Sequence, residues 1–166
     1  MSTPAATAEF LKSVRLFKEL ADADRLALAQ RLREQTLRKG QVLLREGDLG
    51  DEMFLVRTGA IIVSKAVTGR VEQVLARMGP GDFFGEMSLL DHAPRSATIQ
   101  ADGDTTLLVL DAQNLTRLIE VNPRAAVSFF RALAQVFIER LRATGELVAE
   151  VTRWGLEATG LDVDTR

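Results

Sequence analysis

A short stretch near the middle of the chain, "GDFFGEMSLLDHAPRSATIQA", combines a fixed cation, a carboxylate and closely spaced glycines. Arg95 keeps its charge at physiological pH, and its planar fork of N–H donors matches the oxygens of a phosphate group. Ser96 adds a hydroxyl donor, whereas ionised Glu86 only accepts hydrogen bonds and therefore pairs with hydroxyl or amino groups. Gly81 and Gly85 permit tight turns and the close approach of a ligand to the backbone. These residue types fit a ligand with one phosphate, a sugar hydroxyl and an apolar base.

The run "EMSLL", which begins at Glu86, predicts one helical turn whose N–H groups point at the anion. The plainer alternative is that Arg95 and Glu86 form an exposed ion pair, which stabilises a protein by only ~0–1 kcal/mol. From these two residue types alone, both interpretations stay open. His92 lies in the loop between them and is predicted to face solvent without a role.

The composition excludes several kinds of chemistry. The chain has no cysteine and a single histidine, so thiolate metal sites, disulfides and a His-based triad have no residues to form them. We therefore expect neither an enzyme nor a metal centre. The formal net charge of −2 and the pI near 5.5 argue against a chain-wide basic surface, so we expect no direct DNA binding by this chain.

The balance of residues is that of an ordinary globular protein, with 46% apolar and 27% charged residues. The N-terminal segment "MSTPAATAEF" lacks the basic and apolar regions of a signal peptide. No segment approaches the ~18 consecutive apolar residues of a membrane span. We expect a cytoplasmic protein without membrane contact.

Hydrophobic patterning predicts one domain over residues 1–166 that is divided into four segments. The segments are N-terminal helices over 8–33, a β-roll over 34–111, C-terminal helices over 112–155 and a tail over 156–166. Short β-prone runs separated by glycine turns, with no helical period between them, indicate an antiparallel β-roll or jelly roll. The fold class is therefore mostly β with flanking helices. The runs are "QVLLRE", "MFLVRTGAIIVSKAV", "VEQVLARM", "SATIQA" and "TTLLVLD".

Asp22 is the predicted cap of the second N-terminal helix, and Gly155 is the predicted end of a long C-terminal helix. The long helix carries an apolar series with heptad spacing that is typical of a two-stranded seam, so we expect a homodimer through this helix. The alternative is that the stripe covers the domain's own sheet. The series is Phe130, Ala134, Phe137, Leu141, Thr144, Val148 and Val151.

The stretch quoted first resembles the phosphate-binding cassette of the cyclic-nucleotide-binding domain family, in which Gly-Glu is followed by a helical turn and then by Arg-(Ser/Thr/Ala)-Ala. Three further segments resemble the same family: "REGDLGDEMFLVRTGAIIVS", "RMGPGDFFGE" and "LIEVNPRAA". The resemblance covers the chain from Phe10 to Val151. It implies a β-roll flanked by helices that binds a cyclic purine mononucleotide.

The resemblance implies a role for each cassette residue. Arg95 would pair with the cyclic phosphate, and Ser96 with the backbone amide of Ser88 would complete the phosphate cradle. Glu86 would accept a hydrogen bond from the ribose 2′-hydroxyl, and Ala97 would stay small so that its strand can approach. The other expected ligand-binding residues of the cassette are Phe84, Gly85 and Met87.

Resemblance to the bacterial cAMP-responsive activators, through "RLRATGELV", implies that Thr144 reads the adenine amine. Counting forward from "VNP" reaches Arg140 instead, so two candidates for base recognition remain. Trp154 is either a lid on the base or a packing residue. The same resemblance favours cAMP as the ligand, with cGMP as the alternative.

The family's transcription factors continue into a helix-turn-helix domain, and too few residues follow Trp154 for one. The first hypothesis is therefore a stand-alone cAMP sensor that relays binding through its C-terminal helices to the dimer seam or a protein partner. The second is a sensor-domain piece of a Crp-Fnr-like transcription regulator. The third is an interaction domain that keeps the fold without binding nucleotide.

Overall fold

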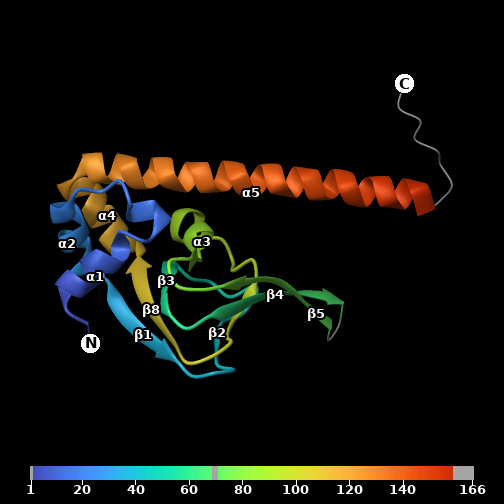
Figure 1. Ribbon diagram of the computed structural model, residues 1–166, viewed down its shortest axis with the longest axis horizontal. Helices are drawn as coiled ribbons and strands as arrows, with labels where there is room; N and C mark the ends of the chain where they lie inside the picture. The colour runs from blue at the N-terminus through green and yellow to red at the C-terminus, as the bar shows by residue number, and fades with distance from the viewer. Residues whose placement is uncertain (1, 69–70, 159–166) are drawn as a thin grey trace. The chain divides into compact units, whose positions relative to one another are not determined.

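The computed structural model describes residues 2–68 and 71–158, and the chain divides into two compact units. The first unit, Met1–Phe129, contains all the strands and most of the helices (Figure 1). The second unit, Phe130–Arg166, contains the greater part of the longest helix.

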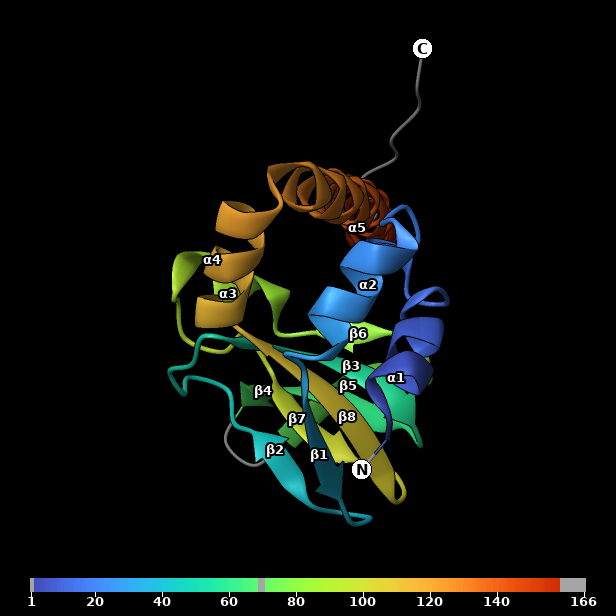
Figure 2. The same ribbon diagram turned by 90° about the vertical axis from the view of Figure 1, so that its left-hand side faces the viewer.

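Eight strands of the first unit form two four-stranded antiparallel sheets (Figure 2). The strand order is β1-β8-β3-β6 in one sheet and β2-β7-β4-β5 in the other. The strands are β1 (Arg33–Leu37), β2 (Val42–Leu44), β3 (Glu52–Thr58), β4 (Ile61–Thr68), β5 (Val71–Met78), β6 (Phe83–Phe84), β7 (Thr98–Ala101) and β8 (Thr105–Asp111).

An apolar core fills the space between the sheets, because alternate side chains of facing strands point inward. The rings of Phe54 on β3 and Phe84 on β6 stack there, with centroids 5.2 Å apart. The two residues are also register partners in the β3–β6 ladder. This pairing brings two segments that are distant in sequence to one end of the sheet. The buried members of the core are Leu37, Phe54, Val56, Ile61, Phe84, Ile99, Ala101, Leu107 and Val109.

The helices of the chain precede, interrupt and follow the strands in sequence. At the N-terminal end lie α1 (Pro4–Leu11), the 3-10 helix η1 (Arg15–Phe17) and α2 (Asp22–Ala29). The remaining helices are α3 (Glu86–Asp91), α4 (Ala112–Val121) and α5 (Pro123–Ala158). Within the first unit, Phe17 of η1 stacks on Phe129 of α5, with ring centroids 5.6 Å apart.

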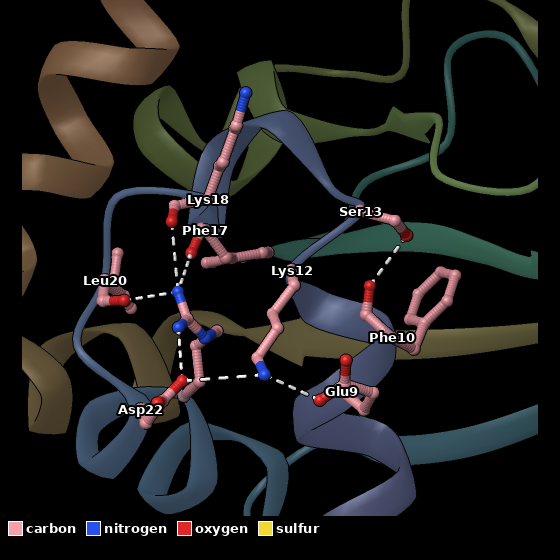
Figure 3. A network of polar contacts seen from close by, with 9 residues as sticks. Glu9, Phe10, Lys12, Ser13, Phe17, Lys18, Leu20 and Asp22 are labelled. Atoms are coloured by element: carbon pink, nitrogen blue, oxygen red, sulfur yellow. Dashed lines mark hydrogen bonds and ion pairs between the residues drawn. The ribbon is translucent and has the colours of Figure 1, made fainter.

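Buried Arg25 holds the turn between η1 and α2. Its Nη1 donates to the backbone oxygens of Phe17, Lys18 and Leu20 (Figure 3). Its Nη2 forms an ion pair with Asp22 at 2.5 Å. One guanidinium therefore satisfies carbonyl groups that the short 3-10 helix leaves without intrahelical partners.

The predicted fold class is confirmed: the structure is an antiparallel β-roll flanked by helices, with a long C-terminal helix. Several predicted boundaries are wrong. The N-terminal helices begin at Pro4, and Asp22 is the first residue of α2 instead of its cap, which is Ala21. The Asp22 carboxylate instead pairs with Arg25, and its Oδ1 lies 3.8 Å from Nζ of Lys12.

Two strands were missing from the predicted runs. β1 has the polar sequence "REQTL", and its pairing with β8 supplies the stabilisation that its residues do not encode locally. β6 has only two residues and depends on β3 in the same way.

The prediction that Gly155 ends the long helix is wrong, because α5 continues to Ala158. Gly155 does not adopt the positive φ of a terminating glycine, so the helix passes through it at a cost of about 1 kcal/mol. Of the predicted tail, residues 156–158 are helical, and 159–166 lie outside the described residues.

Replacing Arg25 with methionine should lower the free energy of unfolding by about 2–4 kcal/mol, because the backbone oxygens of Lys18 and Leu20 lose their donor and that of Phe17 keeps only the amide of Leu20. The matched control is Lys18→Met, since the Lys18 side chain is exposed and only its carbonyl takes part in the network. Chemical denaturation followed by circular dichroism measures both. Equal stability of the two variants would show that water replaces the guanidinium.

Candidate functional site

Arg95 lies between α3 and β7, and only 5% of its surface is exposed. Its Nη1 donates to the backbone oxygen of Glu52 at 2.8 Å and to that of Gly85 at 3.4 Å. Its own backbone is also fixed, because its N–H donates to the oxygen of Asp48 and its oxygen accepts from the amide of Gly47, both at 2.8 Å. The side chain therefore has a defined position at the start of α3.

An aromatic floor supports the guanidinium. Its Cζ lies 5.7 Å from the ring centroid of Phe54, and this ring in turn stacks on Phe84. A cation over an aromatic face is stabilised by the ring quadrupole, and more strongly when it is desolvated. The apolar core thus extends directly beneath the charge of Arg95.

The charge of Arg95 is incompletely satisfied. In the described part of the chain, no carboxylate lies within ion-pair distance of it, and its buried Nε has no hydrogen-bond partner. Burial lowers the pKa of this guanidinium, while the carboxylates of Glu52, Asp51 and Asp48 partly oppose the shift. Bringing an anion to the guanidinium would offset the cost of its burial.

A comparison with Arg25 shows what is distinctive about Arg95. Both arginines have a buried Nε without a partner among the described residues. Arg25, however, has three carbonyl acceptors and an ion pair with Asp22. Arg95 donates from Nη1 alone, so its unused donors can serve a ligand.

Two glycines make room for the guanidinium. A Cβ at Gly50 would lie 2.6 Å from Nη2 of Arg95, and a Cβ at Gly85 would lie 2.8 Å from Nη1. Gly85 also has φ +79° and caps α3, a conformation that residues with a side chain rarely adopt. Gly85 is one of the two glycines predicted to allow a ligand close to the backbone. In the structure, the group that lies close to it is the guanidinium of Arg95.

The remaining cassette residues divide into buried and exposed groups. Phe84, Glu86 and Ser88 are buried, and the last two belong to the first turn of α3. The predicted helical turn over "EMSLL" is thus present. The exposed or partly exposed members of the predicted cassette are Met87, Ser96 and Ala97.

His92 is exposed and caps the C-terminal end of α3, with its amide donating to the oxygen of Ser88. Its φ of +54° makes it the one non-glycine residue with a positive φ in the described part of the chain. This place fits the predicted solvent-facing loop.

The candidates for base recognition belong to the second unit. The Thr144 hydroxyl donates to the backbone oxygen of Arg140 at 2.8 Å, so these two residues lie one helical turn apart on α5. Both are exposed, as is Trp154. All three lie in the second unit, whereas Arg95 lies in the first.

Sequence reasoning missed three contributors to the Arg95 environment. They are Gly50, the backbone oxygen of Glu52 and the ring of Phe54. All three lie in the "REGDLGDEMF" segment, whose glycine next to an acidic pair was a usable signal. The alternative of an exposed ion pair between Arg95 and Glu86 is wrong, because both residues are buried.

Across residues 2–68 and 71–158, no cluster of three His, Cys, Asp or Glu side chains is placed to hold a metal ion. In the same ranges, no helix is both long and apolar enough to cross a membrane.

The first unit thus combines a β-roll with a buried arginine whose guanidinium lies beside Gly50 and Gly85. Comparison with known families shows which class of domain this is. The family model "Cyclic nucleotide-binding domain" matches residues 34–122. The chain belongs to the cyclic nucleotide-binding domain family.

The proteins similar in sequence include a kinase regulatory subunit and a receptor protein. The chain is 34% identical over 113 residues to the cAMP-dependent protein kinase regulatory subunit of Dictyostelium discoideum, covering 66% of this chain and 35% of the relative. It is 39% identical over 104 residues to the Cyclic AMP receptor protein of Thermus thermophilus, covering 63% of this chain and 46% of the relative. The chain thus spans less than half the length of these relatives.

Among solved structures, a cyclic nucleotide-binding domain from Methylobacillus flagellatus superposes with a TM-score of 0.76 at 28% identity. The match covers 87% of this chain and 81% of that one. The likeness therefore extends over nearly all of the architecture described above.

Gly85→Ala should lower the free energy of unfolding by about 1–3 kcal/mol, because a side chain at this φ is strained. Its Cβ would also lie 2.9 Å from the backbone oxygen of Glu52, which cannot easily move. Gly79→Ala is the control, since its Cβ would meet nothing within 4 Å. Thermal and urea denaturation measure both variants, and equal loss in the two would disprove the special role of Gly85.

Proposed function

We propose that this chain is a cyclic-nucleotide sensor whose ligand is cAMP. The observation that carries the proposal is the buried, incompletely satisfied guanidinium of Arg95 within a chain that belongs to the cyclic nucleotide-binding domain family. A cyclic phosphate bears one negative charge, and its two exocyclic oxygens match the planar donor fork of arginine.

The phosphate is held by the donors that surround the start of α3. Arg95 supplies the charge, and the backbone amide of Ser88 lies in the first turn, where helical N–H groups have no intrahelical acceptor. Ser96 follows the arginine with an exposed hydroxyl that is available as a further donor. Gly85 keeps the approach to the α3 amides open because it has no side chain.

The ribose is recognised by Glu86. This carboxylate is buried in the first turn of α3, where a negative charge is favoured by the helix dipole. An ionised carboxylate accepts hydrogen bonds, so the ribose 2′-hydroxyl is its chemical complement. Phe84 and Ala97 limit the space around the ligand, and Met87 flanks it from the exposed side of α3.

Base recognition by α5 favours adenine. The hydroxyl hydrogen of Thr144 is engaged by the oxygen of Arg140, so Thr144 Oγ1 remains as an acceptor. An acceptor complements the amino group of adenine and not the carbonyl of guanine. Arg140 is the alternative reader, and Trp154, which is exposed, is the candidate lid. The names of the kinase regulatory subunit and of the receptor protein also indicate cAMP for those relatives.

The sensor has no catalytic step of its own. One histidine and no cysteine supply no nucleophile with a base and an orienting group. Binding instead shifts the C-terminal helices between two arrangements, which requires that cAMP bind one arrangement better than the other. A homodimer through α5 or a protein partner in the cytoplasm reads this shift. A sensor piece of a longer regulator would use the same site, so that second candidate shares the binding mechanism.

Arg95→Ala should weaken cAMP binding by about a hundredfold or more, because charge-assisted hydrogen bonds each contribute roughly 1.5–3 kcal/mol. Arg95→Lys keeps the charge but loses the fork, so its affinity should fall between those of the wild type and the alanine variant. Calorimetric titration with cAMP and cGMP, after removal of co-purified nucleotide, measures all three proteins.

The matched control for the arginine variants is Arg77→Ala, which removes an exposed arginine paired with Asp102. It should leave affinity unchanged. If folded, nucleotide-free wild type binds neither nucleotide, the chain is an interaction domain instead of a sensor. Tighter binding of cGMP than of cAMP would contradict the choice of adenine.

Leu141→Glu should convert a dimer into a monomer, because it places a charge among the exposed apolar side chains of α5 along the predicted seam. Light scattering measures the molar mass of both proteins. Leu141 is 73% exposed, and Val148 and Val151 are also exposed. Leu141 is a better test than Phe137, which is partly buried and whose replacement would disturb packing as well. Arg142→Glu is the neighbouring control, and a dimer that survives Leu141→Glu would assign the stripe another role.

A further inference from the structure

Residues of α2, of α4 and of the segments that follow them line a groove in the first unit that shares no residue with the nucleotide cassette. Its volume is about 110 Å³, enough for a large apolar side chain. The walls are apolar, and Val121 on the α4 side is 75% exposed. The apolar lining residues are Ala27, Leu28, Leu118 and Val121.

Two arginines line the same groove. Arg31 follows α2, Arg117 lies on α4, and both are exposed. Neither side chain forms a hydrogen bond or ion pair with any residue that the structure describes. Two exposed arginines elsewhere differ, since Arg33 pairs with Glu52 and Arg77 pairs with Asp102, whereas Arg38 and Arg142 are as available as the groove arginines. The groove thus joins an apolar floor to two available cations.

The one acidic residue among those that line the groove, Asp24, already has a hydrogen-bond partner. Asp24 accepts a hydrogen bond from the side-chain amide of Asn122, whose own oxygen accepts from the amide of Ala125 at the start of α5. Asp24 therefore joins α2 to the α4–α5 junction instead of neutralising the arginines. The lining has two positive charges against one negative, so the groove favours an acidic ligand.

We propose that the groove binds an acidic amphipathic segment of a partner protein. A leucine or phenylalanine side chain of the segment fills the apolar floor, and carboxylates on either side of it pair with Arg31 and Arg117. A small organic anion would leave the exposed side chain of Val121 in water, whereas a peptide covers it. Two arginines on a chain of net charge −2 form no basic stripe for nucleic acid.

The test is fluorescence anisotropy on the full chain with three short labelled peptides. The first combines glutamates with a leucine and is called the glutamate–leucine peptide. The lysine–leucine peptide replaces the glutamates by lysines, and the glutamate–serine peptide replaces the leucine by serine. We expect saturable binding of the glutamate–leucine peptide and none of the other two, because the groove needs both the carboxylates and the apolar side chain. Arg31→Gln combined with Arg117→Gln should weaken that binding by about tenfold. Val121→Asp should weaken it to a similar extent, since it places a carboxylate in the apolar wall.

The charge-matched control is Arg38→Gln combined with Arg142→Gln, which removes two exposed arginines outside the groove and should leave peptide affinity within about twofold of the wild type. Circular dichroism verifies that each variant is folded. Failure of the glutamate–leucine peptide to bind overturns the proposal. Equal binding of the lysine–leucine peptide, or an unchanged affinity in the groove variants, overturns it as well.

Nucleotide binding provides a separate readout. The groove variants should bind cAMP as the wild type does, and Arg95→Ala should retain the peptide, because Arg95 does not line the groove. Loss of peptide binding in Arg95→Ala would mean that the peptide occupies the cassette, which overturns the groove proposal and leaves the nucleotide site intact.

Discussion

The desolvated guanidinium of Arg95 is the interaction on which the rest of the site depends. Removing a charge from water is costly, and the neighbouring chain offsets only part of this cost, with two carbonyl contacts and an aromatic face. The lowered pKa of this group reflects the same imbalance. A binding site that is electrostatically incomplete on its own is well suited to an anionic ligand, because the ligand supplies what the protein lacks.

The β-roll produces this environment by joining segments that are far apart in sequence. The ladder between β3 and β6 aligns Phe54 with Phe84, which brings Gly85 and α3 beside the start of β3. Gly50 and Gly85 then leave the space that the guanidinium fills. The two sheets thus act as a rigid support, and the chemistry lies in the loops and the short helix at their edge.

Two further surfaces with exposed apolar side chains lie outside the cassette. The second unit presents exposed apolar residues along α5, and the first presents the apolar groove with two arginines that residues of α2, of α4 and of the segments after them line. Asn122 lies where the groove meets α5. Its side-chain amide donates to Asp24 in the groove, and its side-chain oxygen accepts from the amide of Ala125 at the beginning of α5. One polar side chain therefore connects the groove to the first turn of α5.

The sequence by itself determined the class of fold and the residue types that the cassette contains. Turn residues and β-prone runs predicted most strands, since these signals depend on residue type and local spacing. Glu86 and Arg95 by their types alone left both an anion site and an exposed ion pair open, and the resemblance to the family favoured the anion site. Tertiary structure decided the existence of β1, whose polar residues become a strand only beside β8, and the passage of α5 through Gly155. It also decided that Arg95 is buried over Phe54, because desolvation arises from packing between distant segments, which no local pattern records.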